Sequence, residues 1–341
     1  MENISIIGLD LAKSVFQVHG AAADGSVVLR KKLTRSRVLS FFGGLPKCVV
    51  AMEACASSHY WAREIGRLGH EVRLIAPVYV KPFVKRNKND AADAEAIVEA
   101  ALRPTMRFVA PKSEEQQAAG MAFKTRDLFV RQRTQTINAL RGHLAEYGVI
   151  APKGKAHLGQ LVSVIRDPDS GLPASVAELG RMLIERIEEL GARIDELSEE
   201  VRNRARSDDT VSRLLTIPGI GPICAAAMVA LAPPAQTFSK GRDFAAWLGL
   251  TPRQHSSGGK ERLGRTSKMG QRDLRRLLVS GAMAMVYWTR RNGAPAGSWL
   301  ARMIARKPAM LVAVALANRI ARVAWALMAR GGVYRAPEPA A

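Results

Sequence analysis

The sequence predicts an α/β domain at the N-terminus, a helical middle segment and a mostly α C-terminal domain. Three observations favour this fold class. Short β-branched segments alternate with amphipathic ones in the first third, an apolar heptad pattern runs through the middle third, and apolar helices dominate the last third. The chain has 341 residues, 48% of them hydrophobic, which is enough for two or three domains with sizeable cores.

The first predicted domain, residues 1–110, opens with hairpin strands and continues with alternating helices and strands. Strands are expected at 4–10, 14–19, 26–33, 48–53 and 71–76, and helices at 36–43, 59–68 and 89–102. A doubly wound α/β domain would lack the opening hairpins. The order of elements therefore favours a ribonuclease-H-like fold.

The middle segment, residues 111–208, is predicted to be a helical spacer. One long helix or a helix pair is expected at 112–150, and a further helix at 177–206. The second helix carries a coiled-coil-like heptad seam, formed by Leu183, Ile187, Leu190, Ile194, Leu197 and Val201. This seam fits an intramolecular helical hairpin and intermolecular pairing equally well, and the second alternative predicts a homo-oligomer, a dimer or a tetramer.

The last predicted domain, residues 209–331, is mostly helical, and residues 332–341 are expected to form a disordered tail. A glycine-rich turn at 217–222 precedes an Ala-rich helix, a short helix is expected at 244–250, and a polar glycine-rich segment covers 251–268. Strong helices are expected at 271–291 and 309–330.

The charge of the chain predicts a polyanionic partner. Lys and Arg number 51 against 30 for Asp and Glu, giving a formal net charge of +21. Residues 236–331 alone hold 18 Lys and Arg and 3 acids. A basic excess of this size is typical of proteins that bind nucleic acid, since each phosphate contact needs a cation.

Cysteine usage and hydropathy indicate a cytoplasmic protein that does not insert into a membrane. The 3 cysteines form no CxxC pair, so neither a zinc site nor a disulfide framework is expected. No signal peptide is expected, because the N-terminus runs directly into a strand. Of the two apolar runs, 277–288 is too short to span a bilayer and 309–329 is interrupted by Arg319 and Arg322, so both are interpreted as core helices.

Four acids are candidates for a metal site: Asp10, Glu53, Asp90 and Asp93. Asp10 ends the first strand and Glu53 ends the fourth, so the two side chains meet at one edge if these strands are neighbours. Asp90 and Asp93 share one face at the start of a helix, where negative charge is tolerated. Carboxylates that converge repel unless a cation neutralises them, and oxygen ligands select Mg²⁺ or Mn²⁺. Each acid taken alone has an ordinary explanation, such as a turn cap, a helix N-cap or a solvated surface position.

The segment Ile217-Pro-Gly-Ile-Gly-Pro222 has the pattern of a helix-hairpin-helix. The glycines Gly219 and Gly221 would let the backbone approach a phosphate, and the following helix would offer N–H groups, giving sequence-independent DNA contact. An ordinary tight turn between two packed helices is the alternative.

The polar segment 251–268 contains a candidate nucleophile. Ser256 and Ser257 stand in a glycine-flanked turn and are surrounded in sequence by the cations Arg253, Lys260, Arg262, Arg265 and Lys268. A serine in a cationic setting can act as the nucleophile of a phosphoryl transfer, with the cations stabilising the charge that develops. Composition alone favours an ordinary loop.

Taken together, these motifs resemble the DEDD insertion-sequence transposases, the one-ten family of RNA-guided serine recombinases. The match runs from about residue 4 to residue 330, with the motifs in the family order around a helical middle. The residues that carry it are Gly8-Leu-Asp10 with Lys13, Met52-Glu53-Ala54, Asn87-Lys-Asn-Asp-Ala-Ala-Asp-Ala94, Ile217-Pro-Gly-Ile-Gly221, Phe244-Ala-Ala-Trp-Leu-Gly-Leu-Thr-Pro-Arg253, Ser257-Gly258, and Ser267-Lys-Met-Gly270 with Leu274-Arg275-Arg276.

The resemblance implies a function and its residues. It implies a resolvase-like N-terminal domain in which Asp10, Glu53, Asp90 and Asp93 bind Mg²⁺, and it implies Ser257 as the nucleophile. Because the serine is doubled here, Ser256 remains an alternative. The resemblance also implies an element-encoded guide RNA that base-pairs with donor and target DNA, and association with the nucleoid when the protein is active.

Two other functions fit the same motifs. A Holliday-junction-resolvase-like endonuclease would use only the acids and an activated water, without a covalent intermediate, so Ser257 would be dispensable. A non-enzymatic nucleic-acid-binding protein would use only the helix-hairpin-helix and the basic C-terminal domain. If the four acids do not converge, the enzyme interpretation weakens.

Overall fold

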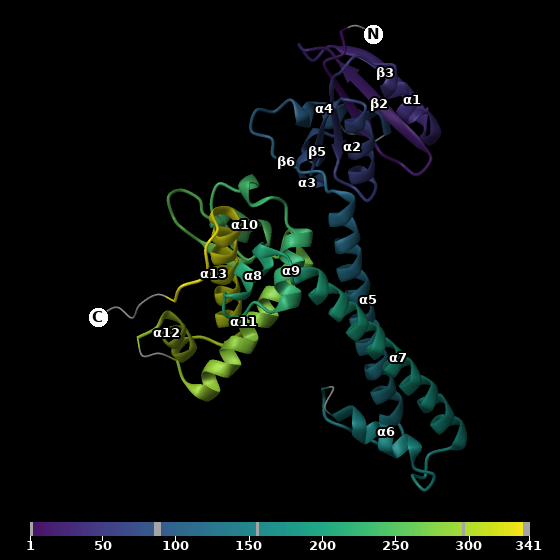
Figure 1. Cartoon of the computed structure of the whole chain (residues 1–341), viewed down its shortest axis with the longest axis vertical. Coiled ribbons are helices and arrows are strands. Elements are labelled where there is room, and N and C mark those ends of the chain that lie inside the picture. The colour runs from purple at the N-terminus through teal and green to yellow at the C-terminus, as the bar shows by residue number, and fades with distance from the viewer. Residues whose placement is uncertain (1–2, 85–89, 155–156, 295–296, 337–341) are drawn as a thin grey trace. The chain divides into compact units, whose positions relative to one another are not determined.

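The computed structural model describes residues 3–84, 90–154, 157–294 and 297–336, without the side chains of Asp90 and Ala91. The chain divides into two compact units, Met1–Glu115 and Gln116–Ala341. The first is a mixed α/β unit with a six-stranded sheet, and the second is mostly helical (Figure 1). This architecture confirms the predicted fold class at the level of an α/β domain followed by a mostly α region. The division of the second unit into a spacer and a C-terminal domain stays a prediction.

The first unit contains every strand and helix that the sequence predicts for it. Its elements are β1 (Ile6–Asp10), β2 (Val15–Ala21), β3 (Val27–Thr34), α1 (Val38–Gly43), β4 (Val49–Glu53), α2 (Ser58–Arg67), β5 (Glu71–Ile75), α3 (Pro77–Val80), α4 (Asp90–Ala101) and β6 (Phe108–Val109). Short 3-10 helices cover Arg35–Arg37 and Lys81–Phe83. The sequence missed β6 and α3 because elements of two and four residues are too short to show a periodic pattern.

The sheet has the strand order β3-β2-β1-β4-β5-β6. The two central pairs, β1–β4 and β4–β5, are parallel, and the outer pairs are antiparallel. β1 is therefore a direct neighbour of β4, which is the condition under which the sequence places Asp10 and Glu53 at the same edge.

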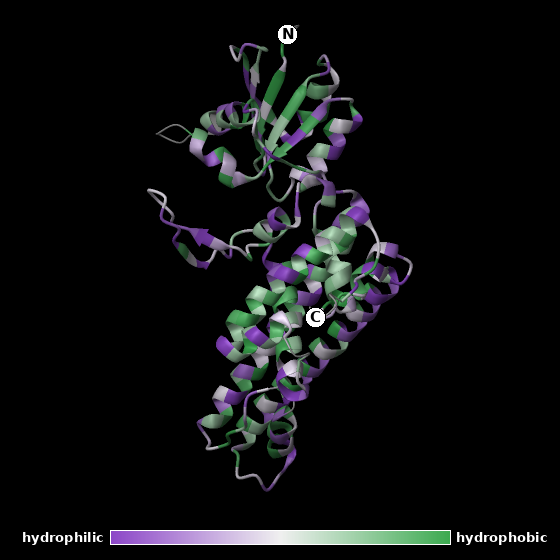
Figure 2. Cartoon of the chain, turned by 90° about the vertical axis from the view of Figure 1, so that its left-hand side faces the viewer, coloured by the Kyte–Doolittle hydropathy of each residue, from purple (hydrophilic) through white to green (hydrophobic). Residues whose placement is uncertain are grey.

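Helices cover both faces of this sheet, and side chains alternate between the two cores along each strand. On one face Ile7, Leu9, Val50 and Met52 pack with side chains of α1 and α2 in one buried cluster. On the other face Ile6, Ala51 and Ile75 pack with side chains of α4. Strands β1 and β4 at the centre of the sheet are accordingly apolar up to their last residues, Asp10 and Glu53. Figure 2 shows the central strands of the sheet as largely hydrophobic.

Helix α4 lies directly on β1 at Gly8. A Cβ atom on Gly8 would lie 2.2 Å from the backbone oxygen of Ala94 and 2.8 Å from Val98 Cγ2. Because the obstacle at 2.2 Å is backbone, rotation of a side chain cannot relieve the clash. Glycine at this position therefore sets how closely the start of α4 approaches the strand that ends in Asp10.

The second unit is built from ten helices and one hairpin among its described residues. The elements are α5 (Glu114–Ala145), α6 (Leu158–Arg166), α7 (Ala174–Ala205), α8 (Asp209–Leu215), α9 (Pro222–Leu231), a 3-10 helix (Ala235–Thr237), α10 (Gly241–Trp247), β7 (Pro252–Gln254), β8 (Leu263–Thr266), α11 (Arg272–Asn292), α12 (Trp299–Arg306) and α13 (Ala309–Arg330). The first two residues of α5 belong to the first unit.

Helices α5, α6 and α7 pack together within the chain. Ile137, Leu140 and Leu144 of α5 share one buried cluster with Leu161 and Ile165 of α6 and with Ile184 and Ile187 of α7. Figure 1 shows α5 and α7 side by side, with α6 near the C-terminal end of α5. The seam of α7 therefore has an intramolecular partner, as one of the two interpretations of the heptad pattern expects.

The buried positions of α7 differ from the expected seam at two places. Ile184 and Ser198 are buried, whereas Leu183 and Leu197 are only half-buried. Buried Ser198 donates a hydrogen bond to the Ile194 carbonyl and accepts one from Arg126 Nε of α5 at 2.7 Å. A polar contact between α5 and α7 thus replaces an apolar one near the end of the seam.

The largest core of the second unit is formed by α8 to α13. Helix α13 contributes Val312, Ala313, Leu316, Ala317, Ile320, Ala321, Ala324, Trp325 and Leu327 to this core. Among the described residues it is the one helix whose length and composition would suit a membrane span, and 50% of its most apolar stretch is buried within the protein. The expected core role of 309–329 agrees with this packing.

Part of the segment expected to be a disordered tail is packed. The backbone N–H of Tyr334 donates to Thr216 Oγ1 at 2.9 Å, and the Tyr334 side chain lies against the core of α8 to α13. Residues 337–341 lie outside the described residues.

We expect Gly8→Ala to lower the free energy of unfolding by about 1–3 kcal/mol, the usual effect of overpacking, because the new methyl group meets the Ala94 carbonyl. Urea unfolding followed by circular dichroism measures the change. Gly66→Ala in α2 is the matched control. A Cβ there has no heavy atom within 4 Å, and alanine is the better helix former, so stability should stay the same or rise. Equal stability of both variants would contradict the close approach of α4.

Candidate functional site

Two of the predicted acids stand at the ends of neighbouring parallel strands. Leu9 of β1 is paired with Met52 of β4. The residue after each of them, Asp10 in β1 and Glu53 in β4, is the last residue of its strand. Both are half-buried. Because parallel strands end at the same edge of a sheet, the two acids lie at the same level of this edge.

The two acids also share the face of the sheet that α4 covers. Side chains alternate along a strand, so Asp10 is on the face of Ile6, and Glu53 is on the face of Ala51. Ile6 and Ala51 both pack in the cluster that contains Ile97 and Ala101 of α4. The strand register and the α4 packing therefore place Asp10 and Glu53 on one side of the sheet.

The other two predicted acids lie in the first turn of α4. Helix α4 begins at Asp90, and Asp93 directly precedes Ala94, the residue whose carbonyl faces Gly8. The start of α4 is thus next to β1, two residues before Asp10. Asp93 is half-buried. The side chain of Asp90 lies outside the described residues, as do residues 87–89 of the motif 87–94.

Among the described side chains, no group of three or more His, Cys, Asp or Glu residues is arranged to hold a metal ion. This finding covers Asp10, Glu53 and Asp93 but leaves out Asp90. Each of these three described acids takes part in an interaction with its surroundings. The backbone brings the acid-bearing positions to one edge, and the metal site itself stays a prediction.

The segment that the sequence predicts as a polar loop contains a β-hairpin. β7 and β8 pair in antiparallel fashion, and Ser257 and Lys260 form a further bridge at the tip. The two residues between them, Gly258 and Gly259, have φ of +56° and +75°. A two-residue turn with positive φ at both positions suits the twist of a hairpin and favours glycine. The loop prediction was therefore wrong: the strands are short and polar on both faces, so they show no hydrophobic alternation.

The two serines of this hairpin have different surroundings. The Ser256 hydroxyl donates to Gln254 Oε1 at 3.0 Å and accepts from the backbone N–H of Arg262 at 3.0 Å. Ser256 thus ties the two strands together. The Ser257 hydroxyl has no hydrogen-bond partner within the described part of the chain, and Ser257 is exposed at the first position of the turn.

The hairpin is largely exposed and carries a net positive charge. Residues 252–263 are all exposed. The predicted cations Arg253, Lys260, Arg262, Arg265 and Lys268 are exposed as well, and none forms an ion pair with a described acid. Figure 2 shows the hairpin as a largely hydrophilic arm of the second unit. Ser257 is therefore an exposed serine in a segment whose lysines and arginines form no ion pair with a described acid.

The glycine-rich turn lies between α8 and α9, as predicted. Gly219 has φ of +89°, and a Cβ on Gly281 of α11 would lie 2.0 Å from the Gly219 carbonyl oxygen. A Cβ on Gly219 itself would lie 2.6 Å from Met285 Sδ of α11, so the positive φ and the packing against α11 account for glycine at this position. Gly221, the N-cap of α9, is exposed, and a Cβ added to it would meet no heavy atom within 4 Å. A nucleic-acid contact of either glycine stays a prediction.

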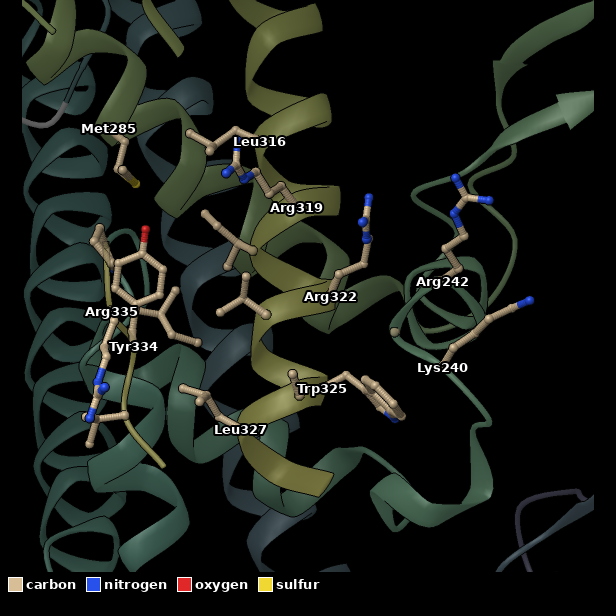
Figure 3. A pocket seen from close by; sticks show the side chains of 17 residues that line it. Lys240, Arg242, Met285, Leu316, Arg319, Arg322, Trp325, Leu327, Tyr334 and Arg335 are labelled. Atoms are coloured by element: carbon tan, nitrogen blue, oxygen red, sulfur yellow. The ribbon is translucent and has the colours of Figure 1, made fainter. Parts of the chain in front are cut away.

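A second cationic cluster was not singled out from the sequence. Lys240 and Arg242 at the start of α10 and Arg322 of α13 line a pocket of about 670 Å³, and Figure 3 shows their side chains extending toward the same open side. All three are exposed and form no ion pair with a described acid. Gly241 packs against the Arg322 backbone, which brings the two segments together. Arg242 and Arg322 are 80 positions apart in the sequence. Sequence periodicity relates only residues that are close along the chain, so the cluster becomes visible only in the folded structure.

The buried thiols are not candidate nucleophiles. Burial raises the pKa of Cys48 to about 11 and that of Cys224 to about 12. Since the thiolate is the reactive form, both side chains are inert near neutral pH. Cys55 is exposed.

Comparisons with known proteins cover nearly the whole chain. A family model described as "Transposase IS116/IS110/IS902 family" matches residues 211–295, and a model described as "Transposase" matches residues 7–149. A probable family 20 transposase of Pseudomonas aeruginosa is 51% identical over 98% of this chain and 99% of its own length. A putative transposase of Sinorhizobium fredii is 46% identical over 99% and 87%, and the transposase for insertion sequence element IS1328 of Yersinia enterocolitica is 40% identical over 98% and 99%.

We expect the triple variant Lys240→Gln/Arg242→Gln/Arg322→Gln to bind duplex DNA with a weaker dependence on salt. If all three cations neutralise phosphates, the slope of log affinity against log salt falls in magnitude by about 0.9 for each cation removed, about 2.7 in all. Fluorescence anisotropy at several salt concentrations measures the slope. The control Arg186→Gln/Arg193→Gln/Arg202→Gln removes the same charge from α7, where each arginine already pairs with a glutamate. Equal slopes for the two triple variants would show that the cluster makes no phosphate contact.

Proposed function

Because this chain belongs to the IS116/IS110/IS902 family of transposases, enzymes that act on DNA, we propose that it cleaves and rejoins DNA through the hydroxyl of Ser257. Asp10, Glu53, Asp90 and Asp93 form the second half of the proposed active site. The family membership rests on relatives that match over the full length, whereas the roles of the individual residues are inferred from their chemistry and placement.

The proposed chemical step is a transesterification. The Ser257 oxygen attacks the phosphorus of a phosphodiester, forms a phosphoserine ester and releases the hydroxyl of the cleaved strand. The seryl proton passes to a base, and attack by a DNA hydroxyl on the phosphoserine ester later rejoins a strand and returns Ser257. The exposed cations Arg253, Lys260 and Arg262 of the hairpin stabilise the charge that develops on the phosphate oxygens.

The observation that supports Ser257 over Ser256 is their hydrogen bonding. The Ser256 oxygen is held between Gln254 and the Arg262 N–H, so an attack by Ser256 would break the hairpin contact. Ser257 carries no such constraint among the described residues, and its turn places the hydroxyl at the tip of the arm.

The acids at the sheet edge are the proposed ligands of Mg²⁺ or Mn²⁺. Their oxygen-only chemistry fits these ions, and the half-buried positions of Asp10, Glu53 and Asp93 leave access for a ligand. A bound divalent ion would supply Lewis-acid stabilisation of the phosphate. A carboxylate of this edge is also the proposed acceptor of the seryl proton.

We further propose that the first unit has a ribonuclease-H-like, resolvase-like fold. Its order of strands and helices and the sheet order β3-β2-β1-β4-β5 support this assignment, since the three antiparallel strands β1 to β3 come first and are followed by β4 and β5, which are parallel to β1.

The proposed partners are donor DNA, target DNA and an element-encoded guide RNA. The excess of cations supports nucleic-acid binding in general, and the guide RNA rests on the family resemblance alone. We propose a homo-oligomer, a dimer or tetramer, that acts in the cytoplasm in association with the nucleoid.

A denaturing gel with labelled DNA tests the proposal. Wild-type protein should trap a protein–DNA adduct, and Ser257→Ala should form none, because alanine has no oxygen to make the ester. Ser256→Ala is the matched control: it removes a hydrogen bond of the hairpin, so the adduct should persist, at a reduced yield. If Ser256→Ala loses the adduct and Ser257→Ala keeps it, Ser256 is the nucleophile. Cleavage unaffected by either change would favour the endonuclease that activates water. A wild type that binds DNA without cleaving it would favour a non-enzymatic role.

A further inference from the structure

A groove runs between the α8–α9 turn and helices α11, α12 and α13. Its volume is about 1360 Å³, above the range of about 300–1,000 Å³ that is usual for small-molecule pockets. The turn from Pro218 to Gly221 forms one wall and offers little more than backbone. Trp288 and Met285 of α11 and Trp299 of α12 supply the large side chains.

Trp288 is unusual among the tryptophans of the chain in its exposure. It is 65% exposed, whereas Trp61 and Trp325 are 3% and 7% exposed and the remaining two are half-buried. Its neighbour Tyr287 is 56% exposed. Of these two adjacent rings of α11, Trp288 lines the groove.

Three arginines near the tryptophans of the groove form no ion pair with a described acid. Arg291 follows Trp288 by three residues on α11 and shares its side of the helix. Arg302 lines the groove from α12, and the Arg319 guanidinium lies over the Trp299 ring at 5.4 Å. None of these arginines forms an ion pair with a described acid. Residues 274–336 contain 11 Lys and Arg and no Asp or Glu.

The excess of Lys and Arg around the groove limits which molecules can bind there. A second copy of this surface would bring the same excess of positive charge, so self-association here is disfavoured. An exposed indole beside arginines that have no acidic partner suits single-stranded nucleic acid, because a base can stack on the ring while the cations contact the phosphates. A duplex offers no free base faces along its length.

We propose that this groove binds an unpaired segment of nucleic acid, with one base stacked on Trp288 and the adjoining phosphates at Arg291 and Arg302. The proposal rests on the proposed function only in requiring that the protein binds nucleic acid. It requires neither the Ser257 chemistry nor a metal.

Intrinsic fluorescence of the full chain provides the first test. A titration with an oligothymidylate of about 16 nucleotides, the upper end of common site sizes for one binding module, should quench the emission, because the stacked indole is the most exposed one. Trp288→Phe keeps a ring that can stack but removes this signal. A wild type whose emission does not change while anisotropy reports binding would overturn the proposal.

Anisotropy with labelled strands provides the second test. Trp288→Ala should weaken binding of the unpaired strand by at least about five-fold, the loss of one stacked base, while Trp288→Phe retains most of the affinity. Affinity for a duplex of equal length should not change. Tyr147→Ala, which removes another exposed aromatic ring outside the groove, should bind as wild type. Running the same series with an oligouridylate shows whether RNA or DNA is the preferred strand.

The outcomes separate this proposal from the proposed function. A normal protein–DNA adduct together with unchanged strand binding by Trp288→Ala overturns the stacking site alone. A Trp288-dependent strand affinity without any adduct supports the stacking site and counts against the serine chemistry. If Trp288→Ala changes the oligomeric state in sedimentation but not the strand affinity, the groove is an interface between copies, and the proposal is wrong.

Discussion

The contact between α4 and β1 at Gly8 is the constraint on which the proposed catalytic edge depends. A Cβ at this position would lie 2.2 Å from the Ala94 carbonyl, so only glycine allows the start of α4 to approach the strand so closely. That approach brings the first turn of α4, with Asp93, next to the strand that ends in Asp10. The parallel pairing of β1 with β4 adds Glu53 at the same level. Backbone packing thus places acids from three separate segments at one edge of the sheet, and the repulsion between their charges is what a divalent ion would offset.

In the C-terminal part of the second unit, a large excess of cations over acids is the organising feature. Residues 236–331 hold 18 Lys and Arg against 3 acids, and the fold distributes them over the hairpin arm, the cluster of Lys240, Arg242 and Arg322, and the groove at Trp288. The arm is largely exposed and has no core of its own, and a two-stranded hairpin without a packed face is only marginally stable. Contact with a polyanion would therefore stabilise the arm and position Ser257 at the same time.

Local patterns predicted five of the six strands of the first unit and the long helices, but not the contacts that complete the sites. The ends of β1 and β4 follow from runs of apolar residues, so Asp10 and Glu53 could be paired from the sequence. The contact of Gly8 with Ala94 joins residues far apart in the chain and leaves no local pattern. The hairpin was predicted as a loop because its polar strands lack alternation, although its Gly258-Gly259 pair is a turn signal. Helices α6 and α12 span nine and eight residues and were missed, and the bonds that distinguish Ser256 from Ser257 require coordinates.

The central claim is that the acids at this edge form one divalent-metal site, and calorimetric titration with Mg²⁺ or Mn²⁺ tests it most directly. Wild-type protein should bind the ion with a measurable heat, and both Asp10→Asn and the double variant Asp90→Ala/Asp93→Ala should lose that heat. Glu146→Gln, which removes an exposed carboxylate elsewhere, should bind as wild type. Equal binding by the wild type and the variants of the edge would contradict the account, because the ion would then be held by other groups.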